Sequence, residues 1–337
     1  MNCRFKIAGL PLQLLLKVRH FFYDKGLIDI YEPPKPSIGI GNLNLGGTGK
    51  TPMTEYIADL LKDKFSVAVI SRGYRRKTKG FVLAGADTGP GEIGDELHQI
   101  YRKFQGKIWA AADVNRRRAV EKLESEINPD VYVFDDIFQH RKVRPGLRLL
   151  LTPFDRIFTE DCLFPAGRLR DLPERARDTD MIVVTKTPPD APRGRKTFIK
   201  QQLSRYGKPV FFMQTVYEKP RRGNRIFDWS YFKGKKFLVV TGIARPQYFI
   251  NELRKKNLTF VVADFPDHVE YTREKAAKIR KKLIRENLDG IITTEKDYAK
   301  LTQAGFDPFY VPVRQKAEEE ELFNQKILTY VDSRKSL

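Results

Sequence analysis

A glycine-rich turn in the first fifth of the chain has the strongest chemical pattern in this sequence. It consists of Gly46, Gly47, Thr48, Gly49, Lys50, Thr51 and Pro52. Backbone N–H groups at a helix N-terminus bind phosphate oxygens, a lysine reaches the terminal phosphates, and a threonine hydroxyl ligates Mg²⁺. The turn therefore predicts a nucleotide-binding P-loop. Asn44 stands where the strict motif has glycine, so this loop is a variant.

Two neighbouring carboxylates follow a second apolar run, Val131–Phe134. They are Asp135 and Asp136. A P-loop requires an acid at the end of a neighbouring buried strand to orient the metal ion. Paired aspartates after a strand are by themselves typical of a turn or a helix cap. After a P-loop they indicate Mg²⁺ ligands, with Asp135 favoured over Asp136.

The elements that must position these residues alternate between short apolar runs and helical patterns. Such alternation predicts a P-loop NTPase-like α/β fold with a doubly wound, mostly parallel sheet. A helix is expected over Pro52–Lys62, because proline is well tolerated in the first turn of a helix. The expected strands of this part are Ser37–Gly41, Ser66–Ser71, Lys107–Ala111, Val131–Phe134, Arg148–Thr152 and Met181–Thr185.

The pattern restarts after a stretch rich in Arg and Gly, which predicts a second, smaller α/β domain. Its expected strands are Phe237–Thr241, Thr259–Ala263, Gly290–Thr294 and Phe309–Val313. The predicted division is an N-terminal amphipathic helix (1–30), a P-loop domain (31–216), a connector (217–229) and a C-terminal domain (230–337). A length of 337 residues is compatible with two domains.

Composition points to an anionic partner. There are 62 Lys and Arg against 42 Asp and Glu, a net charge of +20, which suits nucleic acid, an anionic lipid surface or phosphate-rich small molecules. The apolar run Ile7–Leu16 is too short to span a bilayer and is followed by basic and aromatic residues. It predicts an amphipathic helix that either lies on a membrane surface or packs on the protein body.

Several further motifs make this sequence closely similar to the tetraacyldisaccharide 4′-kinases, the lipid A 4′-kinases of Gram-negative bacteria. The matching segments follow the order of the family. They are Gly41–Leu43, Gly46–Pro52, Ser71–Tyr74, Gly94–Glu96, Asp135–His140, Phe164–Gly167 with Leu169 and Arg170, Phe265–His268 with Tyr271, and Thr294–Asp297. The chain departs from the family at Arg75 and Ile137, where glycine is usual, and at Val269, which replaces a second histidine.

The resemblance implies transfer of the ATP γ-phosphoryl group to the 4′-hydroxyl of a tetraacylated glucosamine disaccharide 1-phosphate. A sugar hydroxyl is a poor nucleophile and needs a base. Asp95 matches the catalytic aspartate of the family, and His268 matches the histidine that pairs with it. Lys50 is expected to bind the terminal phosphates of ATP. Without the resemblance, Asp95 reads as a helix cap and His268 as a loop residue. Thr294–Asp297 reads equally as a capped helix start.

The resemblance also implies which residues hold the acceptor. They are Arg72, Tyr74, Arg116, Gln139, His140, Gly167 and Arg170. Guanidinium groups suit phosphate. Arg117 and Arg118 leave the register of Arg116 ambiguous, and a solvated helix face is the alternative for a single arginine there. For Gln139 and His140 a structural hydrogen bond is the alternative.

Asp95 and His268 fall in different predicted domains, so the sequence suggests that domain closure assembles the site. An acylated acceptor resides in a bilayer, which favours peripheral attachment to anionic lipids on the cytoplasmic face of the inner membrane. No nucleic acid or obligate protein partner is expected. The alternatives are a nucleic-acid-stimulated P-loop NTPase, which the basic charge permits, and a P-loop regulatory protein without phosphoryl transfer.

Overall fold

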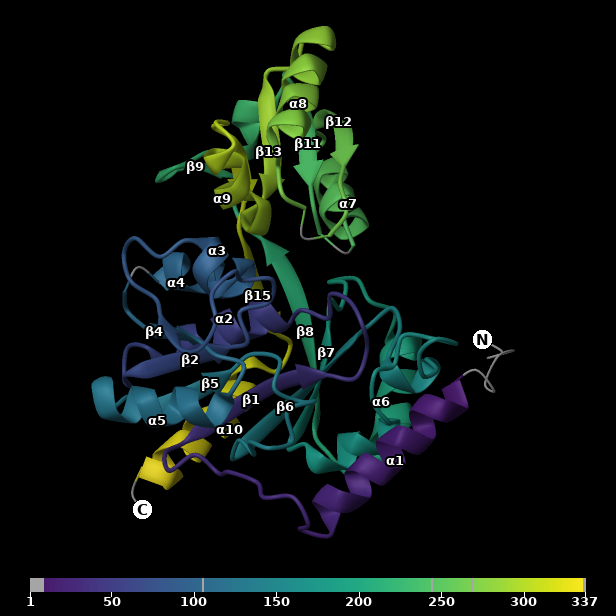
Figure 1. Ribbon diagram of the computed structural model, residues 1–337. Coiled ribbons are helices and arrows are strands. Elements are labelled where there is room, and N and C mark those ends of the chain that lie inside the picture. Colours follow the sequence, from purple (N-terminus) through teal and green to yellow (C-terminus); the bar gives the residue numbers. More distant parts are fainter. Residues whose placement is uncertain (1–8, 105, 244, 268, 336–337) are drawn as a thin grey trace. The chain divides into compact units, whose positions relative to one another are not determined.

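A computed structural model of the chain describes residues 9–104, 106–243, 245–267 and 269–335 (Figure 1). It divides into two compact units. Unit 1 comprises residues 1–215 and 315–337, and unit 2 comprises residues 216–314. The predicted α/β class is confirmed, because each unit contains a mostly parallel sheet with helices between its strands.

Unit 1 is built on a nine-stranded sheet of order β15-β8-β7-β6-β1-β5-β2-β4-β3. The neighbours from β8 to β4 are parallel, and β3 pairs with β4 antiparallel. The strands are β1 (Ser37–Asn42), β2 (Val67–Ser71), β3 (Val82–Leu83), β4 (Trp109–Ala112), β5 (Val131–Phe134), β6 (Leu147–Pro153), β7 (Met181–Thr185), β8 (Val210–Tyr217) and β15 (Val313–Ala317).

The central strand β1 is buried along its whole length and lies between β5 and β6. The carboxyl ends of β1 and β5 therefore lie side by side, and ligands bind beyond the carboxyl ends of such strands. The helices of unit 1 are α1 (Leu10–Asp24), α2 (Lys50–Leu61), α3 (Pro90–Ile93), α4 (Asp95–Phe104), α5 (Arg116–Glu126), α6 (Arg193–Ser204) and α10 (Glu320–Lys335), with short 3₁₀ helices at Phe158–Glu160 and Pro173–Asp178.

The C-terminal helix α10 corrects the predicted domain boundary. Residues 315–337 were expected in the smaller domain, yet they belong to unit 1. Phe323, Ile327 and Val331 recur every fourth residue and are fully buried in the same core cluster as β1 and α2. The Tyr330 hydroxyl also donates to Ser37 O at 3.1 Å, so α10 (yellow) lies beside the start of β1 (Figure 1).

Unit 2 has a six-stranded sheet of order β10-β9-β14-β13-β11-β12. The strands from β14 to β12 are parallel, and β9 pairs antiparallel with both β10 and β14. Its elements are β9 (Arg221–Arg222), β10 (Arg225–Ile226), a 3₁₀ helix (Trp229–Phe232), β11 (Lys236–Thr241), α7 (Gln247–Lys255), β12 (Thr259–Asp264), α8 (Arg273–Arg285), β13 (Gly290–Thr294), α9 (Glu295–Gln303) and β14 (Phe309–Val311).

Two predictions for this region are wrong in detail. The expected connector 217–229 contains β9 and β10 and is part of the sheet of unit 2. The expected strand Phe309–Val313 is divided at Pro312, which has no N–H for a ladder. Residues before the proline pair within unit 2, and β15 after it joins the sheet of unit 1.

The predicted N-terminal helix is present as α1, and it packs on unit 1. Leu16, His20 and Tyr23 form its buried face. Its other face exposes Leu10, Leu14, Leu15, Val18, Phe21 and Phe22. In the described part of the chain, no helix combines the length and the apolar character that crossing a bilayer requires.

Candidate active site

The predicted P-loop lies between the end of β1 and the start of α2. Gly46 and Gly49 have φ angles of +95° and +89°, which only glycine adopts without strain. The end of β7 supports the loop from the side: the Thr185 hydroxyl donates to Thr48 O at 2.7 Å, and Lys186 Nζ donates to Gly47 O at 2.7 Å. The loop therefore leads directly into a helix N-terminus, as phosphate binding requires.

The variant residue Asn44 has a structural role. Its backbone forms an antiparallel bridge with Leu169, and its side-chain Nδ2 lies 3.2 Å from Asp161 Oδ2. Leu45 N donates to Arg168 O, and Arg170 N donates to Leu43 O. The segment before the P-loop is thus paired with the segment that ends at Arg170.

Asp135 is the more deeply buried of the two carboxylates predicted to bind the metal, with 1 % of its surface exposed. Its Oδ1 accepts a hydrogen bond from the Thr54 hydroxyl at 3.2 Å. Burial and repulsion from Glu96 together raise the pKa of the Asp135 carboxyl to about 7, against the attraction of Lys50. A divalent cation would relieve this penalty on the charged form.

Asp136 is held by two cations. Its carboxylate is ion-paired with Arg170 and lies 3.7 Å from Lys50 Nζ. Burial alone would raise the pKa of Asp136, but Lys50 and Arg170 outweigh burial and keep this pKa below its ordinary value. Asp136 is therefore ionised at neutral pH and connects the P-loop lysine to the segment that carries Arg170.

Asn42 joins these groups and was not identified from the sequence. Its side chain is fully buried at the end of β1. Its Oδ1 accepts hydrogen bonds from Arg170 and, at 3.4 Å, from Lys50, and its backbone O accepts one from Gln139 Nε2 at 2.9 Å. The position of Asn42, at the end of an apolar run and before a glycine loop, is the signal that could have identified it.

Of the three adjacent arginines, Arg116 is the one that is buried. Arg117 and Arg118 lie on the outer face of α5, paired with Glu121 and Asp113. Arg116 is 2 % exposed, and burial lowers the pKa of its guanidinium to about 10, although Asp135 and Asp136 attract its charge. Its Nε and Nη2 atoms have no hydrogen-bond partner among the described residues.

Gln139 and His140 lie near the same group of charges. Burial and the charges of Arg116 and Arg72 lower the pKa of His140 to about 4, so its imidazole is neutral at pH 7. Gln139 Oε1 and Arg170 Nε are buried and have no hydrogen-bond partner in the described part of the chain. Such atoms are rare in folded proteins, and a polar ligand would satisfy them.

Asp95 begins α4, and two glycines place it beside the loop after β2. Gly94 has a φ of +88°, and a Cβ there would lie 2.9 Å from the carbonyl carbon of Gly73. This close approach brings Asp95 next to the segment that carries Arg72 and Tyr74, two exposed residues predicted to bind the acceptor.

Gly167 allows a tight turn in the predicted acceptor-side segment. A Cβ on this residue would lie 2.4 Å from Cys162 O and 2.5 Å from Asp161 Oδ1. The turn returns the chain so that Leu169 N donates to Cys162 O, directly before Arg170.

His268 lies outside the described residues, so its pairing with Asp95 stays a prediction. Its neighbour Val269 is 5 % exposed and packs in the core of unit 2. The other two departures from the family pattern are Arg75 and Ile137. Arg75 has a φ of +59°, which accounts for the usual glycine there, whereas nothing in the structure explains Ile137 in the same way.

A known protein family matches almost the whole chain. The sequence profile described as "Tetraacyldisaccharide-1-P 4′-kinase" matches residues 3–332. The chain belongs to this kinase family. A tetraacyldisaccharide 4′-kinase of Flavobacterium psychrophilum is 36% identical over 327 residues, covering 95% of this chain and 94% of the relative. Another, from Bacteroides fragilis, is 36% identical over 339 residues, covering 93% and 89%.

A solved structure is similar along almost the whole chain. It is the LpxK crystal structure from Aquifex aeolicus in complex with ATP, with a TM-score of 0.79 and 28% identity, covering 96% of this chain and 97% of that one. The predicted family and enzyme class, a kinase that phosphorylates a hydroxyl group, are therefore confirmed.

Gly94 provides a test of the predicted position of Asp95. In the Gly94→Ala variant the new Cβ would collide with the backbone of Gly73, and the φ of +88° would be strained by about 1 kcal/mol or more. We expect kcat/KM for phosphoryl transfer to fall at least about tenfold, since small displacements of reacting groups are costly. The matched control is Gly91→Ala, where the added Cβ would have, among the described residues, no atom within 4 Å other than those of its chain neighbours and its own helix backbone. Equal activity of both variants would contradict this account.

Proposed function

We propose that this protein transfers the γ-phosphoryl group of ATP to the 4′-hydroxyl of a tetraacylated glucosamine disaccharide 1-phosphate, a step of lipid A biosynthesis. The supporting observation is that Lys50 and Arg170 both contact the carboxylate of Asp136, beside the carboxyl ends of β1 and β5. A P-loop lysine and an acceptor-side arginine that contact the same carboxylate suit a reaction that moves a phosphoryl group between two phosphorylated substrates.

Lys50 and the N-terminus of α2 bind the transferring phosphates, because cationic and N–H donors stabilise the charge on the equatorial oxygens. Thr51, Asp135 and Asp136 would hold Mg²⁺, which neutralises phosphate charge when it is bound. The donor set fits this ion: a buried carboxyl whose pKa is raised to about 7 gains most from a nearby cation.

Asp95 accepts the proton of the 4′-hydroxyl as the new oxygen–phosphorus bond forms. The bond from the γ-phosphorus to the bridging β–γ oxygen breaks, and ADP carries away that electron pair. The pairing of Asp95 with His268 would orient this carboxylate. We also propose that the two domains close around both substrates.

The acceptor phosphate and sugar are bound by Arg116, Arg170, Gln139 and His140, with Arg72 and Tyr74 at the exposed side. The unpaired atoms of Arg116, Arg170 and Gln139 support this assignment, since guanidinium and amide groups suit phosphate and hydroxyl oxygens. His140 is neutral at pH 7 and offers one donor and one acceptor.

The protein binds peripherally to anionic lipids at the cytoplasmic face of the inner membrane. The exposed face of α1 supports this proposal: Leu14 and Leu15 are 66% and 65% exposed, and Phe21 is 54% exposed. The basic residues Lys17 and Lys25 flank these apolar side chains and suit anionic headgroups.

The kinase reaction is tested with labelled ATP and a panel of acylated glucosamine disaccharide phosphates, separated by thin-layer chromatography. Label should move to the tetraacylated disaccharide 1-phosphate, and Lys50→Ala should lower the rate at least about a hundredfold, because the group that stabilises the transferring phosphate is lost. The control Lys64→Ala changes an exposed lysine after the same helix and should leave the rate unchanged. Stimulation of ATP turnover by DNA or RNA without lipid phosphorylation would favour the NTPase alternative.

Membrane attachment is tested by co-sedimentation with vesicles of phosphatidylethanolamine and phosphatidylglycerol. The double variant Leu14→Ser/Leu15→Ser removes two exposed leucines and should lower the partition coefficient at least about tenfold, because each buried leucine contributes roughly 1.5–3 kcal/mol. Ile284→Ser, on α8 of unit 2, removes a side chain that is 81% exposed and should leave binding unchanged. Undiminished sedimentation of the α1 variant would refute the anchoring role.

A further inference from the structure

The helix α1 packs on unit 1 through a histidine. Its buried face consists of Leu16, His20 and Tyr23, which are 6%, 6% and 7% exposed. His20 lies at the centre of this face. An apolar residue would suffice for packing alone, whereas a buried imidazole requires hydrogen-bond partners.

Both ring nitrogens of His20 have partners from elsewhere in unit 1. Nε2 lies 2.6 Å from Asp171 Oδ1, and Nδ1 lies 3.1 Å from Arg141 Nη1. A guanidinium can only donate, so Nδ1 accepts and Nε2 donates to Asp171. The His20 ring is therefore held on both sides.

Asp171 connects His20 to the acceptor side of the site. It is fully buried, and its Oδ1 also accepts the N–H of Leu172 at 2.8 Å. The preceding residue, Arg170, is ion-paired with Asp136 and donates to Asn42 Oδ1. The position of α1 therefore affects the segment that carries Arg170.

A second contact from α1 reaches the same point. Arg19 Nη2 donates to Gln139 O at 2.7 Å, and Gln139 Nε2 donates to Asn42 O at 2.9 Å. Two adjacent residues of α1 thus contact two separate segments, and both segments meet at Asn42. Asn42 in turn accepts a hydrogen bond from Lys50.

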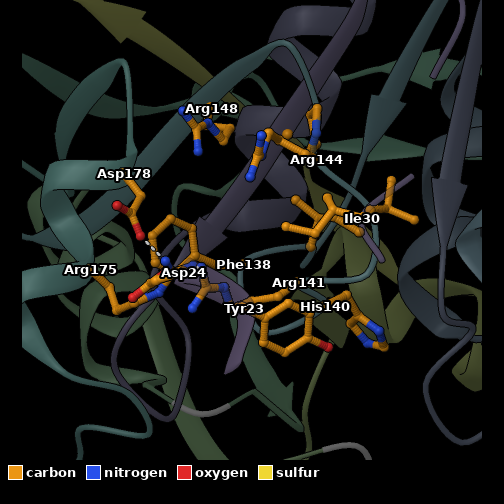
Figure 2. Close-up of a pocket in the computed structure, with 14 residues that line it drawn as sticks. Tyr23, Asp24, Ile30, Phe138, His140, Arg141, Arg144, Arg148, Arg175 and Asp178 are labelled. Carbon is orange, nitrogen blue, oxygen red and sulfur yellow. Dashed lines mark hydrogen bonds and ion pairs between the residues drawn. The ribbon is translucent and has the colours of Figure 1, made fainter. Parts of the chain in front are cut away.

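The C-terminal end of α1 does not pack continuously against the rest of unit 1. A cavity of about 330 Å³ borders the C-terminal end of α1. Figure 2 shows Tyr23, Asp24 and Arg141 on one side of this cavity and Arg144 and Arg148 on the other. Arg141 also pairs with Asp24 at 2.6 Å. Directional polar contacts, more than continuous apolar packing, therefore fix this part of the helix.

We propose that α1 positions the acceptor-binding residues Arg170 and Gln139, acting through the His20–Asp171 pair and the Arg19–Gln139 contact. The proposal rests on the function proposed above, in which both residues bind the lipid acceptor. His20 and Arg19 are positioning residues, since they touch neither substrate. The helix that meets the membrane is then also a structural part of the acceptor site.

The test compares steady-state kinetics of variants in detergent micelles, where attachment to a bilayer plays no part. His20→Leu keeps an apolar packing face but loses the hydrogen bond to Asp171. We expect the KM for the lipid acceptor to rise about tenfold, because the acceptor-binding groups lose their alignment, while the KM for ATP stays within about twofold. His20→Gln restores an N–H donor and should recover most of the acceptor affinity.

Two further variants separate positioning from general effects of substitution. Arg19→Met loses the hydrogen bond to Gln139 O, together with the contact of the guanidinium with the Tyr23 ring, and should raise the acceptor KM about threefold, as expected for loss of one hydrogen bond. Ile284→Ser, at an exposed position on α8 of unit 2, should leave the acceptor KM in micelles unchanged. A purely structural role of His20 would lower the amount of active enzyme and kcat and would leave KM unchanged.

The outcomes distinguish this inference from the proposed function. If the wild type phosphorylates the lipid and both folded variants, or Arg19→Met alone where His20→Leu does not fold, retain the wild-type acceptor KM, the positioning role is overturned. If the wild type transfers no phosphate to any acylated disaccharide, the proposed function fails and this inference fails with it.

Discussion

The arrangement of unit 1 depends on mutual compensation of buried charges at the carboxyl ends of β1 and β5. Asp136 is ionised there because Lys50 and Arg170 lie against it. Asp135 has no ion pair of this kind with any described residue, and burial raises the pKa of its carboxyl to about 7. Uncompensated charge is costly in a low-dielectric interior. The charges of the protein alone do not fully compensate one another at this point. Added phosphates and a divalent cation therefore bind favourably.

The parallel sheet creates this condition. β1 lies between β5 and β6, so the P-loop and the Asp135–Asp136 pair leave the sheet at one edge. The acceptor-side segment is then tied to the P-loop by backbone hydrogen bonds around Leu43 and Leu45. Asn42 receives hydrogen bonds from both sides. Asn42 is buried and accepts hydrogen bonds from Lys50 of the P-loop and from Arg170 of the acceptor-side segment. A displacement of either segment therefore affects the other.

Local patterns in the sequence predicted the sheet well, because completely buried parallel strands appear as continuous apolar runs between turns. Val131–Phe134, Met181–Thr185 and Gly290–Thr294 have the predicted bounds. The helix α10 was assigned to the wrong unit. Its apolar stripe is sparse, and only the complementary surface of unit 1 shows where Phe323 packs. The chain passes from one sheet to the other at Pro312, where a continuous apolar run gave no sign of this change.

The site itself was predictable where a motif fixes chemistry and unpredictable where it depends on tertiary contacts. The P-loop and the carboxylates after β5 follow from residue type and spacing. Three adjacent arginines cannot be distinguished by sequence, and only burial shows that Arg116 faces inward. Asn42, Lys186 and His20 act through partners far along the chain, so their roles depend on the fold. The predicted partnership of Asp95 with His268 stays a prediction.

The most direct test of this account is a double-mutant cycle on kcat/KM with Asp136→Asn, Arg170→Gln and the combined variant. If the two halves of the site depend on each other through this ion pair, the effects will be non-additive, with a coupling energy of about 1 kcal/mol or more. Effects that add to within about 0.3 kcal/mol would contradict it and would mean that Asp136 and Arg170 act independently.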